Sequence, residues 1–354
     1  MILALPARAK LNLSLAVTGA RPDGNHDIDT VLQAIDLHDL LEAEAAPATS
    51  LEVEGDAPAG PENLVLKALA QLERELGRAL PTRFRLHKRI PAGAGLGGGS
   101  SDAATALRLA AALHRLPEAG LAAAAAAVGA DVPFLLCGGA ARGTGRGELL
   151  EPHPVARPGW YAITWPGFPL TTAEVYRAYD QVGGGGLNHL ARGALVVEPR
   201  LADFAQALGE SWRMTGSGSA FFAEAGNREE AEAKRATAPH GCWSVVARAV
   251  APTAYASGVP FDTMRGYLLS LPGLPAGLAE QLRTFSPGAS TLPLPVPADQ
   301  VTSSTADVGG HQATVLTARD GSMAGVVWVD SGVVTAVAGS LSSDEVLAVA
   351  RGLQ

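Results

Sequence analysis

The sequence has 354 residues, of which 47% are hydrophobic, and it carries a formal net charge of −8. This length predicts two to three domains with cores of their own, and the negative charge argues against a nucleic-acid binder. Cys137 and Cys242 form no metal or redox motif, which indicates a reducing, cytoplasmic setting. Residues 1–10 meet charge and proline too early for a signal peptide, and no apolar run is long enough to span a membrane.

The first stretch of the chain places two polar side chains on one face of a predicted strand. In residues 1–19, Lys10 and Asn12 alternate with leucines, a half-buried strand pattern that points both polar residues the same way. A lysine on a strand is most often solvated, whereas beside a phosphate it is an anion contact, and the residues alone leave both roles open. The turn at residues 22–24 precedes His26, which is either a surface residue or part of a ligand-facing loop.

A glycine-rich loop at residues 91–101 is the strongest chemical signal. Strands are predicted in residues 28–54 and an amphipathic helix over residues 61–72. An alternating strand over residues 83–90 then leads into the loop, and an alanine-rich helix over residues 102–113 follows it. Backbone N–H groups in such a loop can converge on an anion, and the helix N-terminus behind it favours phosphate. The sequence therefore predicts a phosphate-binding loop rather than a flexible turn.

Two common phosphate motifs fit this loop poorly. A Walker A loop needs a lysine after its glycines, and none is present. The dinucleotide pattern matches formally at Gly93, Gly95 and Gly98, but Glu118 follows Pro117 instead of ending a second strand. The pattern P-x-G-x-G-L-G-G-G-S-S fits a third type of loop better.

A carboxylate on a loop is the second chemical signal. A predicted helix over residues 118–128 ends at Gly129, and Asp131 lies between this glycine and a proline. Such a carboxylate is exposed in most proteins, but near a nucleotide it can accept the proton of a hydroxyl group that attacks a phosphate. The residues that follow, 134–147, are predicted to form a strand and a glycine turn.

These motifs, together with a glycine–serine segment at residues 214–219, occur in an order that resembles the GHMP kinases, such as galactokinase, homoserine kinase and mevalonate kinase. Over residues 4–250 the chain resembles the branch that acts on 4-diphosphocytidyl-2-C-methyl-D-erythritol. The resemblance implies an α+β fold of two lobes, residues 1–150 and 151–250, with ATP and the cytidine-bearing substrate in a cleft between them. It also implies transfer of the γ-phosphoryl group of ATP to the 2-hydroxyl of that substrate, a step of non-mevalonate isoprenoid precursor biosynthesis.

The same resemblance implies roles for single residues. Lys10 and Asp131 are expected to form the catalytic pair, with Asp131 as the base and Lys10 offsetting the developing charge. The expected ATP contacts are Asn63, Lys88, Pro91, Ala92, Gly93, Ala94, Gly95, Leu96, Gly97, Gly98, Gly99, Ser100 and Ser101. The expected substrate contacts are Asn12, His26, Asp131, Thr172 and Tyr176. Mg²⁺ is expected to accompany ATP, although the sequence shows no cluster of metal ligands.

One position departs from the family pattern. The family usually has a tyrosine before the loop histidine, where it can stack on the cytosine, and this chain has Asn25. Stacking on an aromatic side chain contributes about 1–3 kcal/mol per base, so its loss matters. We therefore expect Tyr176 to be the main residue that stacks on the base, and packing on a helix face is its alternative role.

The remaining residues fall outside this resemblance. Residues 251–261 have the composition of a linker, and residues 262–354 are predicted to form a small, separate β-rich α+β domain. In this tail we expect a helix over residues 262–270, a hairpin around residues 330–332 and a terminal helix over residues 340–353. The tail resembles domains of bacterial extracytoplasmic sensor and lipoprotein-carrier-like proteins. It is either a genuine fusion or the product of two joined reading frames.

The expected protein is thus a cytoplasmic, ATP-dependent kinase of a small molecule, a monomer or weak homodimer, with no nucleic-acid or membrane partner. One alternative is another GHMP small-molecule kinase. A second is a non-catalytic ligand-binding or sensor protein defined by its tail. Loss of Lys10 or Asp131 would mark a non-catalytic protein, and both residues are present.

Overall fold

The structure is a computed structural model. It describes residues 2–117, 120–153, 159–250, 259–260, 301–319, 324–330, 333–339 and 342–352. The chain divides into two compact units, one formed by Ala4–Thr253 and the other by Ala254–Gln354 together with Met1–Leu3. None of the helices in the described part is long and apolar enough to cross a membrane.

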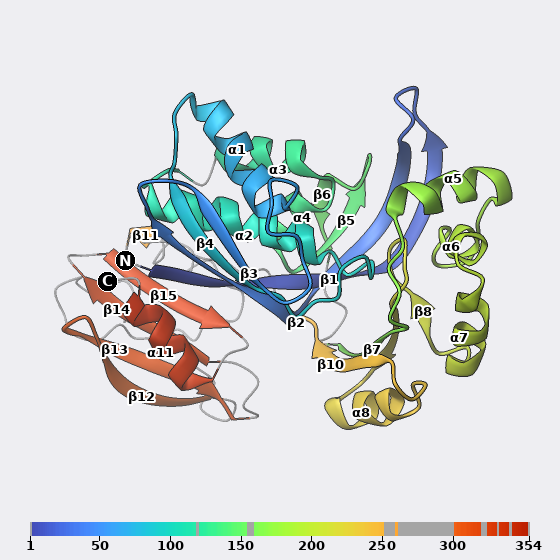
Figure 1. The fold of residues 1–354 in the computed structure, drawn as a ribbon. Helices are drawn as coiled ribbons and strands as arrows, with labels where there is room; N and C mark the ends of the chain where they lie inside the picture. Colours follow the sequence, from blue (N-terminus) through green and yellow to red (C-terminus); the bar gives the residue numbers. More distant parts are fainter. Residues whose placement is uncertain are drawn as a thin grey trace. The chain divides into compact units, whose positions relative to one another are not determined.

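The larger unit begins with a six-stranded sheet. Its strands are β1 (Ile2–Ala20), β2 (His26–Ala45), β3 (Ser50–Glu54), β4 (Thr82–His87), β5 (Ala140–Thr144) and β6 (Leu149–Pro152). They run in the order β3-β4-β2-β5-β6, and β1 pairs with β2. One face is covered by four helices (Figure 1), namely α1 (Leu64–Leu76), α2 (Gly98–Leu113), α3 (Leu121–Val128) and α4 (Val132–Cys137).

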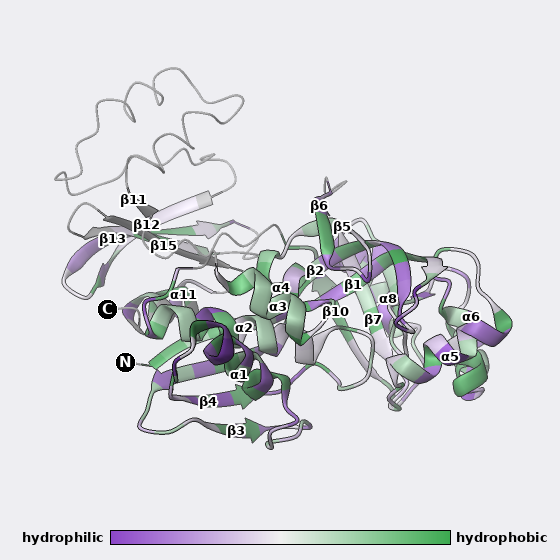
Figure 2. Ribbon diagram, turned by 90° about the horizontal axis from the view of Figure 1, so that it is seen from above, coloured by the Kyte–Doolittle hydropathy of each residue, from purple (hydrophilic) through white to green (hydrophobic). Residues whose placement is uncertain are grey.

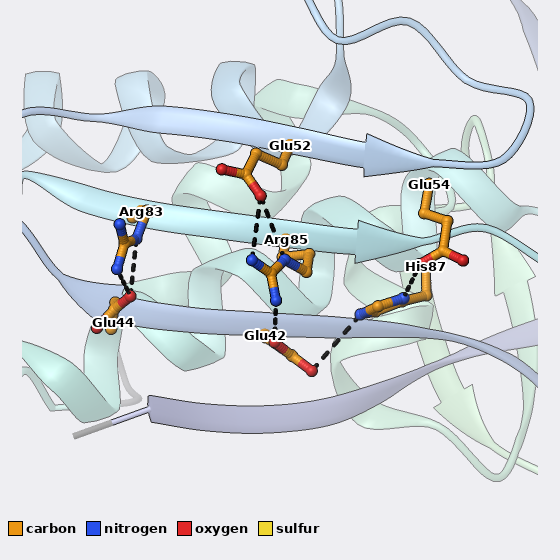
Figure 3. Close-up of polar contacts among 7 residues, drawn as sticks. All are labelled: Glu42, Glu44, Glu52, Glu54, Arg83, Arg85 and His87. Carbon is orange, nitrogen blue, oxygen red and sulfur yellow. Dashed lines mark hydrogen bonds and ion pairs between the residues drawn. The ribbon is translucent and has the colours of Figure 1, made fainter.

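The other face of this sheet carries charged side chains. Hydrophobic and hydrophilic residues alternate along β4 (Figure 2), so Phe84 and Leu86 are fully buried while Arg83 and Arg85 are exposed. Figure 3 shows the resulting ladder of ion pairs across three strands, formed by Glu42, Glu44, Glu52, Glu54, Arg83, Arg85 and His87. Exposed ion pairs of this kind contribute only about 0–1 kcal/mol each to folding stability. The main effect of these charged side chains is therefore to make this face of the sheet hydrophilic.

A second, four-stranded sheet completes the larger unit. Its strands are β7 (Trp160–Trp165), β8 (Arg213–Met214), β9 (Phe221–Ala225) and β10 (Trp243–Arg248), in the order β10-β7-β9-β8. Its helices are α5 (Thr172–Val182), α6 (Ala191–Val197), α7 (Arg200–Leu208) and α8 (Arg228–Ala236). The long β1 and β2 extend toward these elements (Figure 1), and the bridges Leu15–Asn188 and Ile35–Ala249 join the two parts.

The apolar run after Asp131 forms a helix, so the predicted strand at the start of residues 134–147 is wrong. Pro133 occupies the first turn of α4, where a missing N–H costs no hydrogen bond. Phe134 is fully buried. A short apolar run has no periodicity that separates a buried helix from a buried strand, which explains the error. The strand β5 starts only at Ala140.

The smaller unit is built on a five-stranded sheet in the order β11-β15-β14-β13-β12. Its elements are β11 (Val259–Pro260), β12 (Val301–Val308), β13 (His311–Ala318), β14 (Ala324–Asp330), β15 (Val333–Gly339) and α11 (Ser343–Gly352). Val346 and Ala350 of α11 share a core with sheet residues such as Trp328. The hairpin of β14 and β15 and the terminal helix confirm two predictions. The predicted helix over residues 262–270 and most of the predicted linker lie outside the described residues.

Candidate active site

A cavity of about 770 Å³ lies in the larger unit and brings together segments from along the chain. Its walls are formed by Lys10 and Asn12 of β1, residues 24–26 and Ile28, the glycine loop up to Ser100, Ala130 and Asp131, one face of α5, and residues 216–218. One end of this cavity is the glycine loop, which we call the phosphate end. The other end lies between His26 and α5, and we call it the base end.

The phosphate end is built from backbone. Gly93, Gly95 and Gly97 all have positive φ, between 65° and 79°, where a side chain is strained. A Cβ on Gly95 would lie 2.5 Å from the carbonyl oxygen of Thr215, and one on Gly97 would lie 2.8 Å from Cγ of Lys10. The helix α2 then starts at Gly98, earlier than predicted, and its N-terminus has no side-chain cap. Its first N–H groups and its dipole favour a phosphate at this place.

A buried ion-pair cluster lies beneath the first turn of α2. Lys88 Nζ is 2.9 Å from Asp102 Oδ2 and also pairs with Asp39, which accepts a hydrogen bond from Ile90 N. The second oxygen of Asp102 has no hydrogen-bond partner among the described residues. Burial raises the pKa of the Asp102 carboxyl to about 7. Through these two buried ion pairs, Lys88 supports the first turn of α2 on the side that faces the protein interior.

The expected catalytic pair lies between the two ends. Lys10 Nζ is 3.5 Å from Asp131 Oδ2 and donates a hydrogen bond of 2.6 Å to Asn12 Oδ1. The Lys10 side chain is only 5% exposed, whereas that of Asp131 is 36% exposed at the cavity wall. The Lys10 backbone N–H donates to the carbonyl oxygen of Leu96 at 2.9 Å, which ties β1 to the loop. A carboxylate that is open to the cavity and next to a buried ammonium group can accept a proton from a bound hydroxyl.

The segment at residues 214–219 supports the glycine loop from behind. Ala220 N donates to Ala94 O at 2.9 Å, and Thr215 Oγ1 accepts from Asn12 N at 2.9 Å. Asn188 donates its side-chain amide to the carbonyl oxygens of Met214 and Gly216. The sequence reasoning missed Asn188, because only the folded chain shows that it lies against this segment.

The base end is built from side chains on one loop and one helix. The ring of His26 stacks on Tyr176 with centroids 4.9 Å apart and meets the edge of Tyr179 at 6.0 Å. Its Nε2 lies 2.7 Å from Asp180 Oδ1. Thr172 contacts Ser217 at 3.0 Å between hydroxyl oxygens, which holds α5 against the glycine–serine segment. Burial raises the pKa of the Tyr176 hydroxyl to about 12, which keeps it protonated.

Most of the predicted site residues meet at this cavity. The exceptions are Asn63, Lys88 and Ser101, which do not line it. Asn63 caps α1 by accepting from Val65 N at 2.9 Å, and the neighbouring Leu64 reaches the cavity instead. Arg146, Arg177 and Asp180 line the cavity and were not predicted. Asp180 stands four residues after Tyr176 on α5, and this helical spacing was the one signal that could have found it.

Comparison with known proteins shows which family the chain belongs to. The family model described as the GHMP kinases N terminal domain matches residues 63–139. A "4-diphosphocytidyl-2-C-methyl-D-erythritol kinase" of Chromobacterium violaceum is 40% identical over 252 residues, which is 64% of this chain and 87% of that protein. A protein with the same name from Deinococcus radiodurans is 35% identical over 274 residues, covering 69% and 92%. The chain belongs to the 4-diphosphocytidyl-2-C-methyl-D-erythritol kinase family.

Other comparisons place this member of the 4-diphosphocytidyl-2-C-methyl-D-erythritol kinase family among the GHMP folds. The relative from Pelotomaculum thermopropionicum is 47% identical over 187 residues, but the match spans only 51% of this chain and 64% of that protein. A crystal structure of 4-(cytidine 5'-diphospho)-2C-methyl-D-erythritol kinase aligns with a TM-score of 0.57 and 36% identity, covering 70% of this chain and all of that chain. The predicted GHMP kinase fold is confirmed.

A more distant structure shows how much of this likeness is fold alone. The mevalonate kinase of L. major aligns with a TM-score of 0.51 at only 13% identity, over 71% of this chain. The alignment with the solved 4-(cytidine 5'-diphospho)-2C-methyl-D-erythritol kinase uses 70% of the present chain and the whole of that chain.

Proposed function

We propose that this chain transfers the γ-phosphoryl group of ATP to the 2-hydroxyl of 4-diphosphocytidyl-2-C-methyl-D-erythritol. The observation that carries the proposal is the Lys10–Asp131 pair, 3.5 Å apart, in a cavity with the glycine loop at one end and the aromatic group of His26 and Tyr176 at the other. This arrangement provides for a triphosphate, a hydroxyl group and a pyrimidine base in one cavity. The names and the identity of the curated relatives support the same substrate.

At the phosphate end, the triphosphate would accept hydrogen bonds from the backbone of the glycine loop and from the first turn of α2. Mg²⁺ supplies charge neutralisation of the phosphates when it is bound. No three carboxylate, histidine or cysteine side chains cluster as metal ligands within the described ranges. The side-chain oxygens of Ser100 at this end and of Asp131 at the neighbouring centre would nevertheless fit Mg²⁺, which commonly binds one or two protein oxygens besides phosphates and water.

At the centre, Asp131 takes the proton of the 2-hydroxyl as the oxygen attacks the γ-phosphorus. Lys10 holds the carboxylate and the attacking oxygen, and its charge stabilises the negative charge that develops there. Asn12 orients the ammonium group through its Oδ1, while its own amide donates to Thr30 Oγ1 at 2.8 Å. Because the ammonium group is almost fully buried, its interactions act in a medium of low dielectric constant and are strong.

The direct test is an assay of the purified chain with ATP, Mg²⁺ and 4-diphosphocytidyl-2-C-methyl-D-erythritol. We expect ADP release and a new phosphate monoester at the 2-position, which phosphorus NMR identifies. Homoserine, mevalonate and galactose serve as alternative acceptors, because they are substrates of kinases with this fold. A Lys10→Met variant is the control for a contaminating kinase. Turnover of one of the other acceptors, and not of the cytidine compound, would assign the chain to a different small molecule. As a user of ATP and a water-soluble metabolite, the enzyme would act in the cytoplasm.

A further inference from the structure

His26 is held on three sides by residues of one helix. Tyr176 stacks on the imidazole, Tyr179 meets it edge-on, and Asp180 bonds to its Nε2 at 2.7 Å. These three residues stand at the i, i+3 and i+4 positions of α5 and so share one face of the helix. The side chain of His26 is only 7% exposed, although it lines the cavity. The orientation of the ring is therefore fixed before any ligand enters.

The hydrogen bonds of this ring determine what it presents to the cavity. An ionised carboxylate only accepts hydrogen bonds, so the nitrogen beside Asp180, Nε2, carries the proton. The other nitrogen, Nδ1, has no hydrogen-bond partner among the residues that the structure describes. In a neutral imidazole whose Nε2 is protonated, Nδ1 is an acceptor. Asp180 thus leaves His26 with a lone pair available to a ligand.

An acceptor at the base end distinguishes pyrimidines by the group at C4. Cytosine has an amino group there, which donates, whereas uracil has a carbonyl oxygen, which accepts. Stacking on an aromatic ring does not separate the two bases, because both have a π-face. Asn25 also offers no aromatic ring of its own at the position before His26. Hydrogen bonding must therefore supply most of the discrimination in this chain.

We propose that Asp180 is a positioning residue that holds His26 as the Nε2-protonated tautomer and thereby makes the cavity select a 4-amino pyrimidine over a 4-oxo pyrimidine. The inference rests on the proposed function, because it takes the base end to be the place where the nucleotide base of the acceptor substrate binds. It assigns no chemical step to Asp180, which acts only through the imidazole.

The test compares CDP with UDP, and the cytidine substrate with its uridine analogue, in the wild type and in Asp180→Asn. An asparagine side chain can donate to Nε2 as well as accept from it, so the ring proton is no longer confined to Nε2 and Nδ1 can become a donor. We expect the wild type to bind CDP about tenfold or more tightly than UDP, as measured by calorimetry, and we expect the variant to lose most of this ratio. The ratio of kcat/KM for the two substrates should fall in parallel, while the KM for ATP stays the same.

Two further measurements separate this role from a structural one. Nitrogen NMR of labelled histidine reports the tautomer of His26 directly, and Asp180→Asn should change it without unfolding the chain, because the Asp180 side chain is 53% exposed. Glu174→Gln, an exposed carboxylate on the same helix that does not line the cavity, is the matched control and should change nothing.

Several results would overturn the inference. An unchanged CDP-to-UDP ratio in Asp180→Asn, or a His26 tautomer protonated at Nδ1 in the wild type, would each do so. Equal binding of CDP and UDP by a wild type that still phosphorylates the cytidine substrate would reject the inference and keep the proposed function. Selective CDP binding without any phosphoryl transfer would instead reject the proposed function and keep the selection by His26 and Asp180.

Discussion

The two ends of the cavity are built from different parts of the chain, one from backbone groups and the other from side chains. The phosphate end consists of backbone at positive φ and a helix terminus, so its shape depends on the absence of side chains at Gly93, Gly95 and Gly97. The base end consists of side chains, with His26 held by three residues of α5. A backbone site allows few substitutions, whereas a side-chain site can be rebuilt from another element. We propose that this chain uses this freedom, with Tyr176 on α5 providing the aromatic ring that Asn25 in the loop does not.

The centre of the cavity, which serves both ends, should give the largest effect. Asp131→Asn keeps the size of the side chain but cannot take a proton. We expect kcat to fall by about 10²–10⁴-fold, the usual contribution of a general base, while the affinity for ATP, measured by calorimetry, remains. Near-normal turnover would remove Asp131 from its assigned role.

The phosphate end should be the next most sensitive. In Gly97→Ala, the backbone at residue 97 keeps a positive φ that is strained for alanine, and the new Cβ meets the Lys10 side chain. The backbone strain costs about 1–3 kcal/mol. We expect kcat/KM for ATP to fall by about tenfold to a hundredfold. Gly77→Ala is the matched control, because Gly77 also has positive φ but nothing lies within 4 Å of its Cβ. The control should lose stability and keep its KM for ATP; an equal loss in both variants would show strain alone.

The base end should respond through the acceptor substrate only. Tyr176→Ala removes the ring that stacks on His26 and that we propose also contacts the base, and base stacking contributes about 1–3 kcal/mol per base. We expect a higher KM for the cytidine substrate with the KM for ATP unchanged, and Tyr176→Phe should behave as the wild type. Asn25→Tyr should lower the same KM by restoring an aromatic residue at the loop. If neither position affects this KM, the cytosine binds elsewhere.

A change in the buried cluster of Lys88, Asp39 and Asp102 should alter the stability of the fold rather than the turnover. Burial raises the pKa of Asp102 from 3.8 to about 7, so the folded chain binds this proton more tightly than the unfolded chain. Stability contributed by the protonated form is therefore lost as the pH rises from about 4 to about 7. Asp102→Asn cannot ionise, so we expect its free energy of unfolding, measured with urea, to rise relative to that of the wild type from about pH 4 to about pH 7. A constant difference across this range would contradict the shift.

The smallest effect is expected from the tail. We propose that lobes at residues 1–150 and 151–250 suffice for catalysis, because the cavity residues lie between Lys10 and Gly218. A chain ending near residue 253, where the two compact units divide, should keep the kcat and both KM values of the full chain. Inactive truncations at several neighbouring end points would show that the kinase needs the tail.

The same difference between backbone and side-chain construction explains which features could be predicted from the sequence. The glycine loop, Lys10 and Asp131 were found because backbone requirements and strand alternation leave a local trace. The ion pair between Lys88 and Asp39 was not predicted, because these residues are far apart in the chain and no local sequence pattern links them. The bond between His26 and Asp180 spans 154 positions and was missed for the same reason. The helix α4 was predicted as a strand because its apolar run is too short to show a period.

The hydrogen bond from Ala220 N to Ala94 O has a consequence for the growing polypeptide. The glycine loop leaves the ribosome well before the segment at residues 214–219 that lies behind it. Until that segment arrives, Gly95 has no carbonyl of Thr215 to pack against, and the loop lacks this support. We therefore expect nucleotide affinity to appear only after residues 214–219 have been made. Since a ligand stabilises only the form that binds it, we expect cellular ATP to stabilise finished chains and not an N-terminal fragment.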